Sequence, residues 1–297
     1  MKLKQVLTKS WQNPRYLWYA WKNTHYFFPK IYSLQNHFRR SNTFKLGQTS
    51  ELKKLHVILR TTDYVMNINA SRQLEDIGII TKNNVIQTGG CSLFKAASYF
   101  SKVYGIDAIK ITLVVDRLSD KGLNQYRESA KEVSLSFDVV EAKGHGNGPT
   151  FQTQIDIALQ DRDDTLALIL EDDYMLSEEA FCDCFHIMQK YSKVVGMNPH
   201  FHPDRIRRQD TGKLAMIDGR LFSQVFYTCC TFFIPVRVLR RYEKWFRVYD
   251  GFENGSINTI WGKGICLAPF GWTLAEHLHK SDLSPNSSLN KQHDDIY

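Results

Sequence analysis

The stretch that most constrains the fold is Thr165–Tyr174, with the sequence TLALILEDDY. Its apolar residues 166–170 run directly into three consecutive carboxylates, Glu171, Asp172 and Asp173. A short, uninterrupted apolar run predicts a strand that is buried on both faces, as in a parallel sheet. The acidic residues then lie at the carboxyl end of that strand, where open α/β sheets bind their ligands.

Three adjacent carboxylates repel one another unless a cation neutralises them. A divalent ion with oxygen ligands is the natural neutralising partner, and such ions commonly bridge to the phosphates of a substrate. The alternative is a solvated acidic turn at the start of the next helix, where negative charge suits the helix dipole.

The order of apolar runs predicts an α/β fold with a mostly parallel sheet flanked by helices. The expected strands before residue 165 are 55–59, 108–115 and 137–140, and the expected helices are 91–104, 123–133 and 149–159. Beyond the acidic triplet we expect a helix after Ser177, a strand at 194–197, a polar loop at 205–220, a strand at 226–234 and a helix after Pro235.

The net charge of +7 comes from the N-terminal segment 1–50, which contains nine Lys or Arg residues and no Asp or Glu. Its eleven aromatic residues, interleaved with these cations, suit the headgroup region of an anionic membrane. Packing of the aromatics onto the main domain is an equal alternative, and nucleic-acid binding is less favoured. The predicted organisation is therefore a basic, aromatic extension (1–50), a catalytic domain (51–285) and a tail (286–297).

The six cysteines include no CxxC pair, and the sequence has no secretory apolar region. Both observations predict reduced thiols rather than a disulfide framework. No apolar run approaches the length of a transmembrane helix. We therefore expect a cytoplasmic protein, with peripheral contact to the inner membrane face through residues 1–50.

Several common site motifs are absent from the sequence. It contains no GxxxxGK[ST] phosphate loop, no GxGxxG dinucleotide motif and no GxSxG elbow. Two HxH pairs, at 200/202 and 277/279, place imidazoles on one side of an extended segment. Such pairs are more often ordinary histidines, but His277 lies late enough in the chain to fold back and complete an Asp-based metal site.

Charged residues also follow the first two predicted strands. Asp63 and Asp116 end strands that share an edge with the acidic triplet, where a carboxylate can accept a hydrogen bond from a base or a ribose hydroxyl. Arg60 and Arg117 can pair with phosphate. Each residue alone is more often a solvated charge, and their significance is collective.

Together these segments resemble the nucleotide-sugar glycosyltransferases of the GT-A fold. LILEDDY matches the family's apolar strand with its DxD or EDD motif, although EDD is not a strict DxD. The other matching segments are HVILRTTD, ITLVVDRLSD, GHGNGPTFQTQIDIAL and TLAEHLHKSDLSP. They occur in the family's order and cover about residues 55–285.

The resemblance implies a role for each matching residue. Asp173, with Glu171 and His277, would hold Mn²⁺ or Mg²⁺ on the donor diphosphate. The implied donor-binding residues are Arg60, Thr61, Asp63, Asp116, Arg117, Asn147 and Asp172, with Asp116 meeting the nucleobase. An inverting enzyme also needs a carboxylate base. Asp250 and Glu253 have the chain position for this base, and Asp204 is a third candidate.

The expected function is therefore metal-dependent transfer of a sugar from a nucleotide-diphosphate sugar to a hydroxyl acceptor. The acceptor would be a glycan, lipid-linked or protein group, as in surface-polysaccharide or glycoconjugate synthesis. One alternative is a nucleotidyltransferase on a related sheet, although RTTDYVMN lacks the Gly-rich loop and basic residue such enzymes use. The other is a non-catalytic binding protein with this fold.

Overall fold

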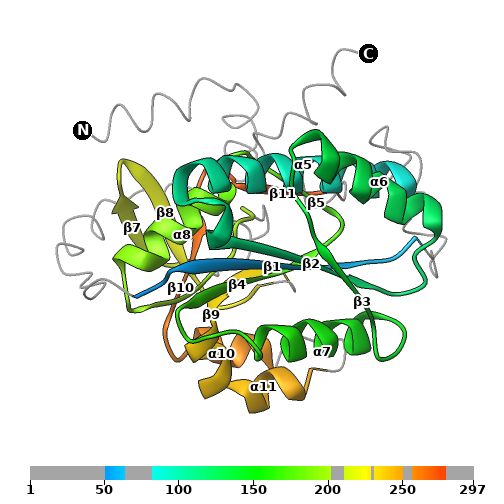
Figure 1. The fold of residues 1–297 in the computed structure, drawn as a ribbon. Helices are drawn as coiled ribbons and strands as arrows, with labels where there is room; N and C mark the ends of the chain where they lie inside the picture. Colours follow the sequence, from blue (N-terminus) through cyan, green and yellow to red (C-terminus); the bar gives the residue numbers. More distant parts are fainter. Residues whose placement is uncertain (1–50, 64–81, 202–210, 229–230, 250–255, 279–297) are drawn as a thin grey trace, which may run out of the picture.

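The computed structural model describes residues 51–63, 82–201, 211–228, 231–249 and 256–278 of the 297-residue chain. A nine-stranded mixed sheet lies between two layers of helices (Figure 1), with the strand order β3-β2-β1-β4-β9-β6-β10-β8-β7. Its strands are β1 (Lys54–Thr61), β2 (Ile109–Val115), β3 (Asp138–Glu141), β4 (Thr165–Glu171), β6 (Val194–Met197), β7 (Thr211–Ile217), β8 (Arg220–Val225), β9 (Phe232–Pro235) and β10 (Ile265–Pro269).

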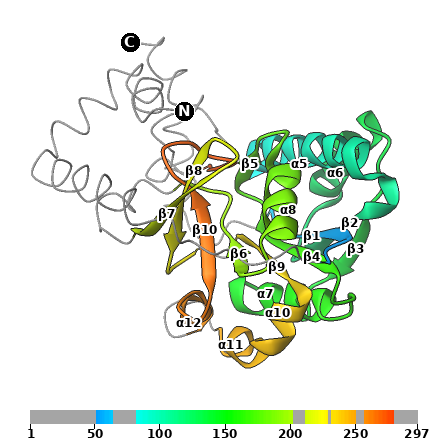
Figure 2. The ribbon, with the colours of Figure 1, turned by 90° about the vertical axis from the view of Figure 1, so that its left-hand side faces the viewer.

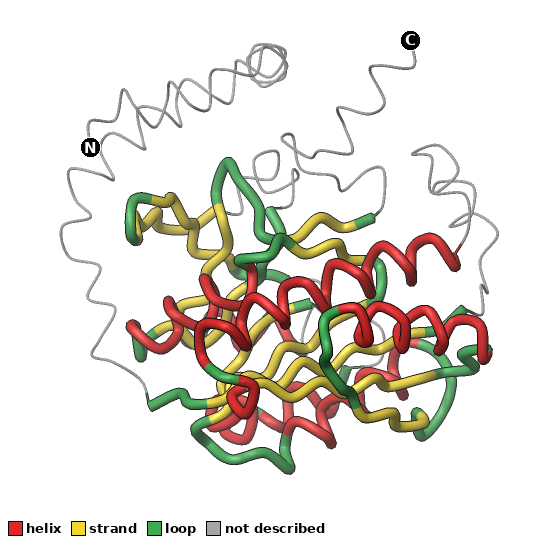
Figure 3. The backbone as a smooth tube through the Cα atoms, turned by 45° about the horizontal axis from the view of Figure 1, so that its top comes forward, coloured by secondary structure: helices red, strands yellow, loops and turns green. Residues whose placement is uncertain are grey.

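The helices cover both faces of this sheet, as the tube view also shows (Figure 3). One face carries α5 (Lys82–Tyr104), α6 (Asp120–Glu132) and α8 (Ala180–Lys190). The other carries α7 (Asn147–Ala158), α10 (Val236–Arg241), α11 (Glu243–Arg247) and α12 (Ile257–Trp261). A 3₁₀ turn, η1 (Ile106–Ala108), joins α5 to β2. The predicted fold class, an α/β sheet flanked by helices, is confirmed.

The parallel half of the sheet reverses its strand order between β1 and β4. Strands β3, β2, β1 and β4 run parallel, with α5 and α6 crossing on one face and α7 crossing on the other. Such a reversal is a topological switch point, and ligands of open α/β sheets bind at the carboxyl ends of the strands beside it. The remaining strands form a mixed half, which ends in β8 and β7 (Figure 2).

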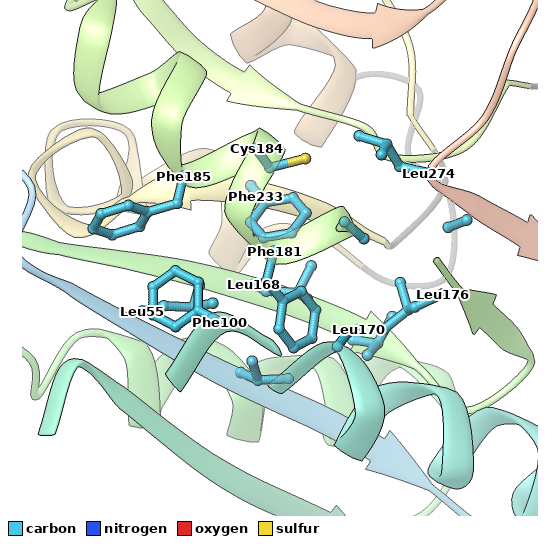
Figure 4. Packing of buried hydrophobic residues seen from close by; sticks show 14 of the residues in the cluster. Leu55, Phe100, Leu168, Leu170, Leu176, Phe181, Cys184, Phe185, Phe233 and Leu274 are labelled. Atoms are coloured by element: carbon cyan, nitrogen blue, oxygen red, sulfur yellow. The ribbon is translucent and has the colours of Figure 1, made fainter. Parts of the chain in front are cut away.

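Strand β4 is buried on both faces, as its apolar run predicts. Leu166, Leu168 and Leu170 pack on the α5 and α8 side, whereas Ala167 and Ile169 pack on the α7 side. Figure 4 shows leucines of this strand among aromatic rings from α5 and α8. The alternation of side chains along a strand supplies both hydrophobic clusters from one segment.

A second, two-stranded sheet pairs β5 (Tyr174–Leu176) with β11 (Ala275–His277) in antiparallel fashion. Strand β5 follows β4 almost directly and contacts α5, whereas β11 comes from the last described segment of the chain. This pairing brings a late segment back beside the acidic triplet.

Several element boundaries differ from the predictions. Helix α5 begins at Lys82 rather than residue 91, so Gly89 and Gly90 lie inside it, where a Cβ atom would come within 3 Å of neighbouring atoms. The predicted loop 205–220 is wrong over its described part, which contains β7 and the start of β8. Asp218 and Gly219 have positive φ angles of 47° and 80° between these strands, the conformation that favours Asp-Gly in tight hairpins.

The predicted strand 226–234 is also wrong over much of its length. Strand β8 ends at Val225 and β9 begins at Phe232. Between them the backbone N–H of Thr228 donates to Asn258 Oδ1, 3.0 Å away, instead of joining a strand ladder. A tertiary partner outside the apolar run therefore binds the backbone of Thr228, and β9 begins only at Phe232.

None of the helices in the described part of the chain is both long and apolar enough to cross a membrane.

Gly89 lies where α5 crosses the connection between β4 and β5. A Cβ atom there would lie 2.7 Å from the carbonyl oxygen of Asp172 and 3.2 Å from that of Tyr174. We expect Gly89→Ala to lower the free energy of unfolding by about 1–3 kcal/mol, because backbone atoms cannot rotate away from the added methyl group. Urea denaturation measures this change. Gly262→Ala is the control, because its Cβ would meet one atom at 3.7 Å, and equal stability of the Gly89 variant and wild type would contradict the packing.

Candidate functional site

The candidate site lies at the carboxyl edge of the parallel strands, beside the switch point between β1 and β4. The two strands pair so that Arg60 lies opposite Glu171. Asp116, which follows β2, donates its backbone N–H to the carbonyl oxygen of Thr61, 3.0 Å away. The polar residues predicted at three separate strand ends therefore lie along one edge.

Arg60 and Glu171 form an ion pair at this edge. Nη2 of Arg60 donates to Oε1 of Glu171, and its Nη1 donates to the carbonyl oxygen of Asn147, 2.8 Å away. Burial raises the pKa of Glu171, the charge of Arg60 opposes this rise, and the charge of Asp173 adds to it. The predicted metal ligand Glu171 and the predicted phosphate ligand Arg60 thus contact each other.

Asp172 holds the end of β1 against β4. Its Oδ2 accepts hydrogen bonds from Thr61 Oγ1 at 2.9 Å and from the backbone N–H of Thr62 at 3.1 Å. Tyr126 of α6 donates its hydroxyl to the same Thr61 oxygen, 3.0 Å away. Asp172 and Thr61 are buried, so these contacts join three elements within the chain. Their predicted role toward a donor remains a prediction.

Asp173 and His277, both half-buried, meet at this edge. His277 Nε2 lies 3.1 Å from Asp173 Oδ2, although 104 positions separate the two residues in the sequence. The backbone N–H of Leu278 donates to the carbonyl oxygen of Asp173 at 2.7 Å, which fixes the strand that carries the histidine. The predicted return of His277 to the acidic motif is therefore seen in the structure.

The side chains of Asp173 and His277 can supply two ligands of a divalent cation. A bound substrate and water would supply the remaining ligands. No group of three or more His, Cys, Asp or Glu side chains converges within the residues the structure describes. The pair offers one oxygen and one nitrogen, and the Asp173 side chain is 35% exposed. Mg²⁺ and similar ions often take only one or two carboxylates and fill the other positions with phosphate oxygens and water.

Asp116 is surrounded by donors from its own chain. His145 Nδ1 lies 2.6 Å from Oδ1, the backbone N–H of Gly146 donates to Oδ2 at 2.8 Å, and the guanidinium of Arg117 contacts both oxygens. Burial alone would raise the pKa of Asp116, but the hydrogen bonds from Arg117, Gly146 and His145 outweigh it and lower the pKa. The predicted donor-binding residues Asp116 and Arg117 therefore anchor the loop before α7.

Asp63 and Asn147 occupy the two sides of this edge. Asp63 Oδ2 accepts hydrogen bonds from the backbone N–H of Ser119, 2.9 Å away, and from its hydroxyl group. Ser119 in turn caps α6, so the observed contacts of Asp63 stabilise that helix start. Asn147 is the exposed first residue of α7, and its carbonyl oxygen binds Arg60.

The predicted catalytic carboxylates Asp250 and Glu253 lie outside the described residues, as do Asp204, His202 and His279.

Three site residues escaped the sequence analysis. His145 lies in a Gly-rich loop, and its partner Asp116 is 29 positions away in the sequence, so the loop composition was the only signal that could have drawn attention to it. Gln154 of α7 donates Nε2 to the carbonyl oxygens of Ile58 and Leu170, at 2.6 and 2.9 Å. Thr231 accepts the backbone N–H of Glu171 at 3.2 Å. No pattern in the sequence marks the last two.

A cavity of about 400 Å³ lies at the opposite, amino end of the strands, lined in part by Lys54, His56 and Asp161. His56 is buried, with Nδ1 2.5 Å from Asp161 and Nε2 2.8 Å from the hydroxyl of Thr112. Both ring nitrogens have partners: the contact with Asp161 holds the segment after α7 to β1, and the contact with Thr112 joins β1 to β2. This cavity is remote from the carboxylate edge, which is the better site candidate on chemical grounds.

No protein-family model and no curated protein matches the sequence. Among solved structures, the chain is similar to the mannosyltransferase PcManGT of Pyrobaculum calidifontis in complex with GDP-Man and Mn²⁺, at 11% identity and a TM-score of 0.43. This match covers 74% of the present chain and 55% of the mannosyltransferase. The chain therefore spans about half the length of that protein.

Two further structures give matches of the same quality. S. aureus TarS 1-349 in complex with UDP is 14% identical over 75% of this chain and 59% of that fragment, with a TM-score of 0.42. A putative glucose-1-phosphate thymidylyltransferase from Bacillus anthracis is 12% identical over 80% and 99% of the two chains, with a TM-score of 0.41. With every TM-score below 0.5, these likenesses do not identify the activity of this chain.

Replacement of Asp116 by asparagine tests the loop anchor. Because the folded-state pKa of Asp116 is lowered, its carboxylate stabilises the fold above the ordinary Asp pKa and loses that effect as pH falls through the folded value. We expect Asp116→Asn to cost about 1.5–3 kcal/mol of unfolding free energy at pH 7 and progressively less below about pH 4. Denaturation at several pH values measures this. Asp138→Asn, on the exposed strand β3, is the control, and a loss that does not depend on pH would contradict the ionic anchor.

Proposed function

We propose that this protein is a metal-dependent glycosyltransferase of the GT-A type, which transfers a sugar from a nucleotide-diphosphate sugar to a hydroxyl acceptor. The observation that carries this proposal is the contact between Asp173 and His277 at the switch-point edge. A carboxylate and an imidazole from distant segments meet there, where open α/β sheets bind their ligands. The acceptor we propose is a glycan, lipid-linked or protein hydroxyl group.

In this proposal, Asp173 and His277 hold Mn²⁺ or Mg²⁺ on the donor diphosphate. The cation would neutralise charge that develops on the leaving diphosphate. Cation binding needs the same Nε2 lone pair and carboxylate oxygen that now face each other at 3.1 Å. Since metal ligands must be deprotonated, we expect affinity to fall at acid pH.

Other residues along this edge would bind the nucleotide part of the donor. Arg60 orients the carbonyl oxygen of Asn147 at the start of α7, where the helix dipole favours negative charge. His145, held by Asp116, has a 69% exposed side chain and is available for a hydrogen bond to the donor. We propose these groups as the nucleotide side of the site.

The acceptor side requires a carboxylate base if the reaction inverts the anomeric centre. We propose Asp250 or Glu253 for this role, on their chain position after the metal motif. In the described residues, Glu171 is not available for it because Arg60 binds its carboxylate.

We also propose that residues 1–50 contact an anionic membrane surface, which would place the enzyme beside a lipid-linked acceptor. Nine cations and eleven aromatic residues without any acidic residue support this proposal.

Donor binding is tested by thermal unfolding of the full chain with a panel of nucleotide sugars, with and without Mn²⁺. We expect one donor with Mn²⁺ to stabilise the protein, by about 2.7 kcal/mol at a ligand concentration of 100 times Kd. Asp173→Asn and His277→Ala should abolish the Mn²⁺-dependent part. Asp218→Asn, on an exposed turn, is the control and should respond like wild type. If no nucleotide sugar stabilises the protein with metal present, the proposed function is wrong, and binding without sugar transfer would indicate a non-catalytic protein.

Membrane contact is tested with the full chain on vesicles. We expect the triple variant Trp11→Ala, Trp18→Ala and Trp21→Ala to bind vesicles of anionic lipid at least several-fold more weakly than wild type, since interfacial aromatic rings contribute to binding. Co-sedimentation measures the bound fraction, and neutral vesicles provide the comparison for charge. Equal binding by the variant and wild type would contradict the membrane role.

A further inference from the structure

The strand that carries His277 is short and depends on neighbouring segments for its position. β11 spans only Ala275–His277 and pairs with β5, which is also three residues long. A two-stranded ribbon of this size is at best marginally stable by itself. The placement of His277 therefore requires further contacts.

Those contacts come from the segment after β6. The carbonyl oxygen of Pro199 accepts the backbone N–H groups of Leu274 and Ala275, at 3.0 and 3.2 Å. His200 forms an isolated parallel bridge with Ala275, and its Nδ1 lies 2.9 Å from the Ala275 carbonyl oxygen. The Thr273 hydroxyl, 2.5 Å from the same oxygen, is a second donor to it.

The partner of His200 fixes which ring nitrogen carries the proton. A carbonyl oxygen can only accept, so Nδ1 of His200 must be the donor in this contact. The side chain is 1% exposed, and burying a polar ring without a hydrogen bond costs free energy. The hydrogen bond to β11 provides this buried ring with a partner at Nδ1.

The ring of His200 also contacts the groups around His277. Tyr174 stacks on His277, with ring centroids 4.8 Å apart and planes at 17°. His200 meets Tyr174 edge to face at 5.9 Å and His277 at 6.3 Å. The three rings therefore pack as one group behind the contact between His277 and Asp173.

We propose that His200 is a positioning residue for the metal site: its Nδ1–H bond to Ala275 and its ring contacts hold His277 against Asp173. This inference rests on the proposed function, in which Asp173 and His277 hold the cation. Groups that orient metal ligands typically change metal affinity 10- to 100-fold when they are replaced. His200 belongs to the HxH pair at 200/202, and the structure assigns it this supporting role rather than a place beside the cation.

The test compares three variants of the full chain at position 200. His200→Asn can place an amide N–H near the Nδ1 position and keep the bond to Ala275. His200→Gln places its amide farther out, and His200→Leu fills the space without a donor. We expect the dissociation constant for Mn²⁺, measured by calorimetry, to rise 10- to 100-fold in the Leu and Gln variants and to stay near the wild-type value in the Asn variant.

A second readout does not require metal. Hydrogen exchange of residues 274–278 in the metal-free protein reports whether β11 is held, including the Leu278 amide that donates to Asp173. We expect faster exchange in the Leu and Gln variants and near wild-type exchange in the Asn variant. His186→Leu, at an exposed histidine that contacts Asp218, is the matched control and should change neither measurement.

The two readouts separate failure of this inference from failure of the proposed function. If exchange of 274–278 is the same in wild type and in the Gln and Leu variants, the positioning role is wrong, whatever the metal affinity. If the Leu variant does not fold, hydrogen exchange of 274–278 in the Gln variant is compared with that in the Asn variant, and equal exchange in the two contradicts the positioning role. If exchange changes as expected but wild type binds no Mn²⁺, His200 positions His277 as proposed and the metal-dependent function is wrong.

Discussion

The junction of β1 with β4 is the contact on which the rest of the site depends. Asp172 accepts hydrogen bonds from Thr61 and Thr62, and Gln154 donates to a carbonyl oxygen from each strand. These bonds hold two strands whose crossover helices lie on opposite faces of the sheet. Open α/β sheets bind ligands at the carboxyl edge beside a switch point, and here buried hydrogen bonds hold the two strands together at that edge.

This junction also explains how three adjacent carboxylates coexist. Glu171 binds the buried guanidinium of Arg60, Asp172 accepts bonds from the end of β1, and Asp173 lies beside His277. Each carboxylate therefore has a different partner. These three separate interactions offset the repulsion expected between the like charges of the triplet. Of these three carboxylates, Asp173 is the one that the described structure places beside an imidazole, a group that can share a divalent cation with it.

The predictions from sequence succeeded where a single segment carried the signal. The apolar run 166–170 identified the doubly buried strand β4, and the late position of His277 agreed with its return to the acidic motif. They failed where the partner came from elsewhere in the chain. His145 beside Asp116 and the β7–β8 hairpin depend on contacts or turn conformation that apolar periodicity does not report.

The α/β class, the parallel half of the sheet and the edge at which polar residues gather could be inferred before the structure, because they follow from the period and order of apolar runs. The partner of each carboxylate depends instead on tertiary contacts. Arg60 pairs with Glu171 because strand register places them side by side, and His277 meets Asp173 because β11 pairs with β5. Register and long-range pairing bring together residues more than a hundred positions apart. The late position of His277 made its return to the acidic motif an expectation, but apolar periodicity does not encode these contacts.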